Sequence, residues 1–322
     1  MGSGAFSRAL PLDRVPPMPT FVDSKTHPAL DRLVRTQLEV WPEHEKYLSS
    51  RFAEAATPFA EKVAEAIEKI GESPRELAED YRWLCGRLYE EELHFRRTGA
   101  YRLSRFEDAV REVYANDEFM RRYMNALLIS QLWWANHTRV IDTFANRFLP
   151  ENRADYSHLE IGPGHGLLLY FAAHDPRCRA VTGWDLSEAS LDATRAALGR
   201  LGVDREVALV KRNLFDRADA SQLFDSIVLS EVCEHLEDPK SALEHIRDHL
   251  APGGRLFVNV PVNSPAPDHI YLLRSPEEAV ELVKSAGYRV TDTSFFPMTG
   301  YSETRARRLK ATISCVVVGV HP

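Results

Sequence analysis

The sequence HLEIGPGHG, residues 158–166, decides the fold of this chain. It starts with HLEI, a segment as long as a short strand, continues with three glycines at alternate positions, and leads into an apolar run at 167–173. Glycine adopts left-handed backbone conformations and lets the main chain approach a ligand closely. Open α/β sheets bind their ligands at the carboxyl ends of the strands. The pattern therefore predicts a strand, a ligand-binding loop and a helix in that order.

Short apolar runs alternate with amphipathic stretches of helical length after residue 150. The predicted strands are 158–161, 180–184, 207–210, 226–229, 255–260, 288–296 and 314–320. The predicted helices are 166–173, 188–201, 239–250 and 276–286. This alternation predicts an α/β fold with a doubly wound, mostly parallel seven-stranded sheet. No helix is predicted between the last two strands, so we expect them to pair antiparallel at the end of the sheet, with one inserted beside its predecessor.

The chain before residue 150 has a helical pattern. Apolar residues recur at intervals of three and four over 52–70, 77–88 and from 117 onward, which predicts an all-α N-terminal domain. Ser73 and Pro74 have the residue types of an N-cap and a first helical position. Prolines are dense in the first thirty residues and predict an extended arm. We therefore expect an arm at 1–30, a substrate-capping or dimerisation domain at 31–150 and a ligand-binding domain at 151–322.

The composition is that of an ordinary globular protein, with 44% hydrophobic and 27% charged side chains among 322 residues. A formal net charge of -7 gives no electrostatic case for a nucleic-acid partner. The longest apolar runs are far shorter than the roughly 20 residues that a membrane span needs. The 4 cysteines form no CxxC pair, which suits a reducing compartment. We expect a cytoplasmic protein with no nucleic-acid or membrane partner.

Residues after the second and third predicted strands extend the ligand site. Asp185 and Leu186 follow the second strand, where a carboxylate can accept hydrogen bonds from both hydroxyls of a ribose. Asn213, Leu214 and Phe215 follow the third strand, where an amide can read an adenine edge and an aromatic ring can cover its face. These residues predict a nucleoside pocket. The Gly-x-Gly-x-Gly spacing differs from the dinucleotide fingerprint, which has one more residue before its third glycine.

Taken together, these motifs resemble those of the class I S-adenosylmethionine-dependent methyltransferases. The matching segments are 160–166, Asp185, 213–215, FDSIVLSEVCEHLEDP at 224–239, and 250–254 with the strand after it. They occur in the family's order, and the resemblance covers roughly residues 155–322. It implies a Rossmann-like methyltransferase fold with S-adenosylmethionine as the cofactor.

The resemblance also implies a role for each matching residue. The methionine end of the cofactor is expected to lie against Glu160, Gly162, Gly164 and Gly166. The ribose is expected at Asp185 and Leu186, and the adenine at Asn213, Leu214 and Phe215. Ser230 and Glu231 are expected to leave the fourth strand facing the transferable methyl group.

Candidate bases follow the fourth and fifth strands. Methyl transfer from a sulfonium is an in-line displacement, so the protein aligns the acceptor and, for a protonated acceptor, removes a proton. Glu231, Glu234 and His235 are the candidates on the loop after the fourth strand, and His269 is a further one after the fifth. Glu231 is the first choice because it lies nearest the strand end, and His235 is the second. Glu234 and His235 also have a structural interpretation, because such a segment can open the next helix by capping and packing.

The same segment also contains residue types that bind metals. His245 and His249 are spaced i and i+4, a spacing found in metal ligands, and Cys233 and His235 precede them. The two histidines are expected well along a surface helix, away from the cofactor edge. We therefore predict no metal.

Two other segments supply candidate substrate contacts. Trp134, Asn136 and His137 precede the cofactor domain, and their polar groups need partners if they are buried. The alternative is that the tryptophan fills the joint between domains. Tyr301 and Arg305 lie between the last two strands, where an arginine can clamp a carboxylate or phosphate. The alternative is a solvated charged face.

The central hypothesis is an enzyme that methylates oxygen, nitrogen or carbon of a small molecule, in the biosynthesis of a specialised metabolite. An NAD-type oxidoreductase on the same fold is the second hypothesis, and the glycine spacing argues against it. The third is a non-catalytic scaffold that binds S-adenosylmethionine and acts through its helical domain. A second copy of the chain is a further candidate partner, through the same domain.

Overall fold

A computed structural model describes residues 21–52, 58–215 and 222–322 of the chain. Within these ranges a seven-stranded sheet has the order β3-β2-β1-β4-β5-β7-β6. Its strands are β1 (Tyr156–Ile161), β2 (Cys178–Asp185), β3 (Val207–Lys211), β4 (Phe224–Ser230), β5 (Leu250–Val262), β6 (Arg289–Pro297) and β7 (Ile313–Val320). The predicted doubly wound α/β fold is confirmed, with strand ends that differ by a few residues.

The strand order positions the ligand site. β1 pairs in parallel with β2 on one side and β4 on the other, so the connections after β1 and β4 leave in opposite directions. Ligands of open α/β sheets bind in the crevice at such a reversal. β7 pairs antiparallel with both β5 and β6, which confirms that the last strand is inserted beside its predecessor.

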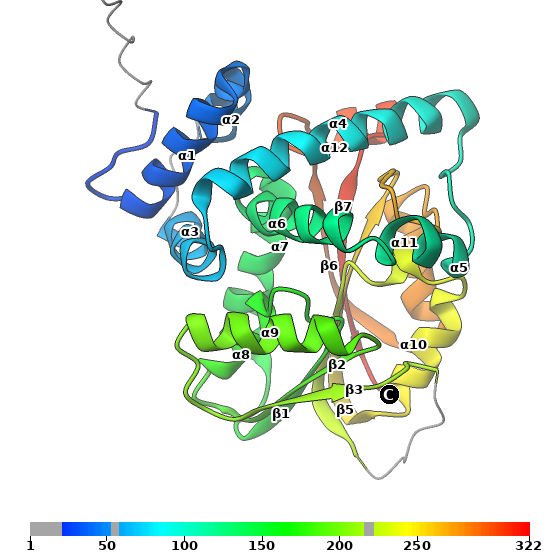
Figure 1. Ribbon diagram of the computed structural model, residues 1–322. Coiled ribbons are helices and arrows are strands. Elements are labelled where there is room, and N and C mark those ends of the chain that lie inside the picture. The colour runs from blue at the N-terminus through cyan, green and yellow to red at the C-terminus, as the bar shows by residue number, and fades with distance from the viewer. Residues whose placement is uncertain (1–20, 53–57, 216–221) are drawn as a thin grey trace, which may run out of the picture.

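Helices cover both faces of the sheet (Figure 1). α8 (Leu167–Ala173) and α9 (Glu188–Arg200) cover one face, and α10 (Pro239–Arg247) and α11 (Pro276–Ser285) cover the other. Val228 of β4 belongs to the first hydrophobic core, whereas its neighbours Ile227 and Leu229 belong to the second. This alternation follows from the strand, in which successive side chains point to opposite faces.

A short helix, α12 (Glu303–Leu309), lies between β6 and β7, where no helix was predicted. Ser302 caps it by accepting a hydrogen bond from the Arg305 backbone N–H at 3.3 Å. Ala306 is its only buried residue in the described chain, so the helix carries no apolar periodicity that the sequence could reveal. The prediction that no helix lies between the last two strands was therefore wrong.

The N-terminal region is helical, as predicted. Its helices are α1 (Pro28–Val40), α2 (Glu45–Phe52), α3 (Pro58–Ile70), α4 (Pro74–Thr98), α5 (Phe106–Ala109), α6 (Asp117–Trp133) and α7 (Ala135–Thr143). Ser73 accepts from the Glu76 N–H at 3.3 Å, which confirms it as the N-cap of α4. Pro28 begins α1, so the predicted arm ends earlier than residue 30, because proline is tolerated at a first helical position. Residues 1–20 of that arm lie outside the described residues.

The helical region shares its hydrophobic core with one face of the sheet. Phe144 and Phe148, which follow α7, pack on Phe257 of β5 with ring centroids 5.5 and 5.2 Å away. His165, in the loop after β1, donates a hydrogen bond from Nε2 to the backbone carbonyl of Met124 on α6 at 2.7 Å. Figure 1 shows α4 and α6 lying across one end of the sheet. The helices are thereby held over the edge where the predicted site lies.

Candidate active site

The loop after β1 needs its glycines. Gly162, Gly164 and Gly166 have φ values of 65°, 50° and 71°, a region that residues with a Cβ adopt at a cost. A Cβ on Gly166 would lie 3.2 Å from the side chain of Leu198 on α9, which is tighter than an ordinary contact. The close packing of α8 and α9 on the sheet therefore depends on this loop conformation.

Glu160 is a buried acid that ends β1 two residues before this loop. Its side chain is 4% exposed, and Oε2 has no hydrogen-bond partner within the described residues. Burial raises its pKa well above the ordinary value, although the N–H of Leu169 opposes the shift. A buried acceptor without a donor is costly, and a donor group on a bound ligand would remove that cost.

Asp185 has the free acceptor positions that a ribose needs. One carboxylate oxygen accepts from the Ser187 N–H and the other from the Ser190 hydroxyl, each at 2.8 Å. A carboxylate offers about four lone-pair positions, so about two remain for a ligand. Leu186 and Phe215 are 50% and 41% exposed, so both present apolar surface at the ends of neighbouring strands. An adenosine between the ends of β2 and β3 would cover apolar surface of this kind.

The other predicted adenine residues are held locally. Asn213 Oδ1 accepts from the Phe215 N–H at 3.0 Å, which fixes the turn after β3, and within the described residues its amide N–H groups have no acceptor. Leu214 is half-buried and packs against the second hydrophobic core. Asn213, Leu214 and Phe215 thus follow one strand end, next to Asp185 at the end of the neighbouring strand.

Glu231 leaves β4 in a strained conformation. Its φ is 55°, a left-handed value that is uncommon for a residue with a long side chain. Asn259 of β5 holds this geometry, because its Nδ2 donates to Glu231 Oε1 at 2.8 Å and to the Ser230 hydroxyl at 3.0 Å. The Asn259 carbonyl also accepts from the Glu231 N–H at 2.9 Å. Asn259 was not predicted as a site residue from the sequence. The signal that could have found it is a single amide within an otherwise apolar strand.

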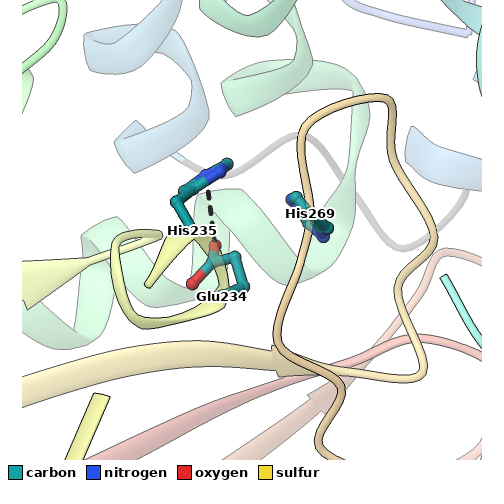
Figure 2. A group of neighbouring side chains, drawn as sticks. All are labelled: Glu234, His235 and His269. Carbon is teal, nitrogen blue, oxygen red and sulfur yellow. Dashed lines mark ion pairs between the residues drawn. The ribbon is translucent and has the colours of Figure 1, made fainter. Parts of the chain in front are cut away.

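Three of the candidate bases, Glu234, His235 and His269, lie in one cluster. Glu234 and His235 lie on the turn after β4, and His269 lies on the loop after β5 (Figure 2). His235 Nε2 is 3.9 Å from Glu234 Oε1, and the His235 and His269 ring centroids are 5.0 Å apart. Burial is the main cause of the raised pKa values of Glu231 and Glu234, and it lowers that of His269 to about 4.

Asp268 and two tyrosines complete the cluster and were not predicted. Asp268 is 3% exposed and accepts from the hydroxyls of Tyr123 at 2.6 Å and Tyr114 at 3.2 Å. Burial raises its pKa, but the neighbouring His235 and His269 outweigh burial and hold the pKa below its ordinary value. These tyrosines come from the helical region, so this region contributes directly to the site.

The segment at 234–235 does not cap the following helix. Asp238 is the N-cap of α10 and accepts from the Ser241 N–H at 3.0 Å. The expectation that Glu234 and His235 cap this helix is therefore wrong. Glu234 instead uses its backbone carbonyl to accept from the N–H groups of Ile270 and Tyr271, which ties the turn after β4 to the loop after β5.

The predicted substrate residues near α7 already have intramolecular partners. Trp134 Nε1 donates to the Tyr81 hydroxyl at 3.0 Å. Asn136 is 3% exposed and donates to the Ser314 hydroxyl of β7 at 2.9 Å. The His137 ring packs edge-on against Trp134 with centroids 4.8 Å apart, and burial lowers its pKa to about 4.

Tyr301 and Arg305 lie together beyond β6. The Arg305 guanidinium sits over the Tyr301 ring, 4.4 Å from its centroid. Tyr301 also lines a cavity of about 470 Å³ between α2, α3, α7 and the segment after β6, together with Arg51 and Arg139. Arg305 is exposed and is not part of that lining.

The two histidines weighed as metal ligands, His245 on α10 and His249 just beyond its end, each bond to a backbone carbonyl. His245 Nδ1 bonds to the backbone carbonyl of Ser241 at 2.7 Å, and His249 Nδ1 bonds to that of Gln222 at 3.3 Å. In the described chain, the side chains that can jointly reach one ion are Glu234, His235 and His269.

Comparisons with known proteins identify the family. A family described as a methyltransferase domain matches residues 133–305. The ubiquinone biosynthesis O-methyltransferase of Alkalilimnicola ehrlichii is 30% identical over 126 residues, which are 39% of this chain and 49% of that protein. Its counterpart in Idiomarina loihiensis is 36% identical over 102 residues, 31% of this chain and 40% of that protein. The chain thus spans about half or less of the length of these curated relatives.

A solved structure shares the fold. An O-methyltransferase family protein from Burkholderia thailandensis superposes with a TM-score of 0.50 at 14% identity, covering 83% of this chain and 73% of that one. No helix of the described residues is long and apolar enough to cross a bilayer. The family match, the strand order and the glycine loop agree, and the chain belongs to the class I S-adenosylmethionine-dependent methyltransferases.

Proposed function

We propose that this protein transfers the methyl group of S-adenosylmethionine to a small-molecule acceptor in the biosynthesis of a specialised metabolite. The observation that carries the proposal is the pairing of the glycine loop after β1 with Asp185 after β2, within a chain of this family. The relatives are named for O-methylation, so oxygen is the first acceptor atom to test.

The cofactor assignment follows the chemistry of each residue. Glu160 and the backbone of Gly162, Gly164 and Gly166 would hold the charged methionine end, because Glu160 has an acceptor oxygen without a partner in the described part of the chain. Asp185 would bind the ribose hydroxyls through its two remaining acceptor positions. When bound, S-adenosylmethionine supplies an electrophilic methyl group on a sulfonium.

The adenine would lie against the exposed side chains at the ends of β2 and β3. Leu186 and Phe215 offer apolar surface, Asn213 offers amide donors, and Leu214 packs beneath. Ser230 ends β4 beside Glu231 and would border the methyl-bearing end of the cofactor. Removing these contacts is expected to weaken cofactor binding more than turnover at saturation.

Glu231 is the proposed base, with His235 and His269 as alternatives. Asn259 holds the Glu231 carboxyl by a hydrogen bond, and burial favours uptake of a proton because it disfavours the charged carboxylate. A base must lie within hydrogen-bond reach of the acceptor proton. When the base is already held in position, no reorganisation is needed at the moment of reaction. Glu231→Gln is expected to reduce kcat while leaving cofactor affinity unchanged.

The acceptor would contact the helical region. Trp134, Asn136 and His137 form the wall between α7 and the sheet, and Tyr301 and Arg305 lie beyond β6. A net charge of -7 and the helical cover over the site favour a small acceptor over a polyanion. Cytoplasmic location and a homodimer formed through the helical region remain part of this proposal.

Calorimetry and product analysis test the proposed function. The full chain is titrated with S-adenosylmethionine, S-adenosylhomocysteine and NAD, and then incubated with S-adenosylmethionine and a panel of phenols, amines and oxo acids. Binding of the first two ligands and release of S-adenosylhomocysteine only with an acceptor would support the proposal. Tight NAD binding without S-adenosylmethionine binding would overturn it. Saturable S-adenosylmethionine binding without turnover on a broad metabolite extract would favour the scaffold hypothesis.

A further inference from the structure

We propose that Glu234, His235 and His269 form a binding site for one divalent first-row transition-metal ion. One ligand atom from each of these residues lies within 4.8 Å of the other two. Metal–ligand distances of about 2.1 Å place ligand atoms about 3–3.5 Å apart, so atoms at the 4.8 Å limit would need to approach one another by about 1–2 Å. Figure 2 shows that they come from two separate turns that face each other.

Glu234 points independently to a cation. Its side chain is 0% exposed, and neither carboxylate oxygen has a hydrogen-bond donor in the described part of the chain. A buried carboxylate without partners is among the most costly arrangements in a protein interior, and a bound metal ion satisfies it.

Both imidazoles are oriented as metal ligands are. His269 Nδ1 donates to the Ser264 carbonyl at 2.7 Å, and His235 Nδ1 donates to the Asp268 carbonyl at 3.2 Å. These bonds fix the tautomer and leave Nε2 of each ring with a lone pair. For both Nε2 atoms, the described residues supply no hydrogen-bond partner. Metal-binding histidines almost always donate their other N–H to a carbonyl or carboxylate in this way.

Asp268 supports the same geometry from a second layer. Its carboxylate lies 3.6 Å from His235 Nδ1 and is itself held by the hydroxyls of Tyr114 and Tyr123. A carboxylate behind a ligating histidine raises the basicity of the ring and fixes its direction. The helical region therefore helps to position the site through its two tyrosines.

The charge of the cluster also favours a cation. Glu234 and Asp268 are buried carboxyl groups and Glu231 is a partly buried one, and within the described ranges no lysine or arginine forms an ion pair with any of them. A divalent ion would supply the positive charge that these carboxyl groups lack.

The donor set selects the type of ion. Two imidazole nitrogens and one carboxylate suit Fe²⁺, Co²⁺ or Zn²⁺, whereas Mg²⁺ prefers oxygen ligands. Three protein ligands leave positions open for a ligand from solution. If the proposed methyl transfer is correct, an acceptor oxygen would bind there and lose its proton more easily, beside the Glu231 carboxyl. The metal site itself does not depend on that function.

Cobalt binding tests the site directly. Tag-free full-length protein is stripped with a chelator and loaded with Co²⁺, and the retained metal is counted by mass spectrometry after gel filtration. One Co²⁺ per chain is expected, with visible ligand-field bands, and an equal concentration of Mg²⁺ should not displace it. Glu234→Gln and His269→Phe should each weaken Co²⁺ binding by more than about 100-fold, and Asp268→Asn by about 10- to 100-fold.

A matched control and a second measurement keep the test decisive. His245→Phe removes a histidine on α10 that lies outside the cluster and should leave Co²⁺ binding unchanged. X-ray absorption of the wild-type Co²⁺ protein should show two imidazoles, whether or not the variants fold. No retained Co²⁺, unchanged binding in Glu234→Gln and His269→Phe, or an all-oxygen coordination shell would each overturn the site. Such a failure would leave the calorimetry with S-adenosylmethionine unaffected, so the two proposals can fail separately.

Discussion

Replacing Asp185 by alanine should weaken S-adenosylmethionine binding by about 1.5–3 kcal/mol. The figure follows from the acceptor count: two positions of the carboxylate are used by Ser187 and Ser190, and about two remain for the ribose hydroxyls. A hydrogen bond to a charged acceptor contributes about 1.5–3 kcal/mol. Asp185 is partly exposed to solvent, which weakens such bonds, so the two ribose hydroxyls together are expected to contribute within that range. At 1.4 kcal/mol per factor of ten, the dissociation constant should rise roughly 10- to 150-fold.

Isothermal titration calorimetry with S-adenosylmethionine and S-adenosylhomocysteine measures this change. Asp185→Asn keeps one acceptor oxygen without the charge and should give a smaller loss. Asp192→Ala is the matched control, because Asp192 is an exposed carboxylate on α9 that pairs with Arg195. It should leave affinity unchanged. An Asp185→Ala variant that is folded by circular dichroism and binds both ligands as tightly as the wild type would refute the ribose assignment.

Three further predictions concern stability, each measured by urea denaturation. Gly166→Ala forces φ 71° on alanine and places its Cβ 3.2 Å from a neighbouring side chain, so a loss of about 1–2 kcal/mol is expected. Gly199→Ala, with open space in α9, should instead add about 0.5–1 kcal/mol, and equal effects would contradict the strain argument. Glu61→Ala removes the acceptor of two N–H groups in the first turn of α1 and should cost about 2–3 kcal/mol, whereas loss of the more exposed Glu68 should cost under about 1 kcal/mol. Burial lowers the pKa of His158 to about 3, so the unfolded chain takes up this proton near pH 6.5 while the folded chain resists it. Stability should therefore fall between pH 6.5 and pH 3 by up to about 1.4 kcal/mol per pH unit from this group, and a His158→Gln variant with the wild-type pH dependence would contradict the assignment.

The cofactor side of the site was predictable because its signals are local. Gly162, Gly164 and Gly166 follow a strand directly, and their positive φ values are the reason that glycine is needed there. Asp185 also stands at a strand end, and parallel strands bring such ends to one edge. The roles that these residues take with a cofactor stay predictions.

The cluster after β4 and β5 was only partly predictable. Glu231, Glu234, His235 and His269 were identified as candidate bases, with a structural role preferred for Glu234, but Asp268 was not given a part in that chemistry. The Tyr114 hydroxyl bonds to Asp268 across 154 positions of sequence, and no local pattern reports such a contact. The short helix α12 was missed for a related reason, since one buried alanine gives no periodicity.

The sequence by itself determined the order of the strands and longer helices along the chain, the glycine loop and the carboxylate at the end of β2. These features could be predicted because backbone preference and hydrophobic periodicity act over a few neighbouring residues. The tertiary structure alone decided that Tyr114 and Tyr123 from the helical region meet Asp268 beside His235 and Glu234. That meeting depends on how the helices pack over the sheet edge, and packing is a property of the whole core rather than of any one segment.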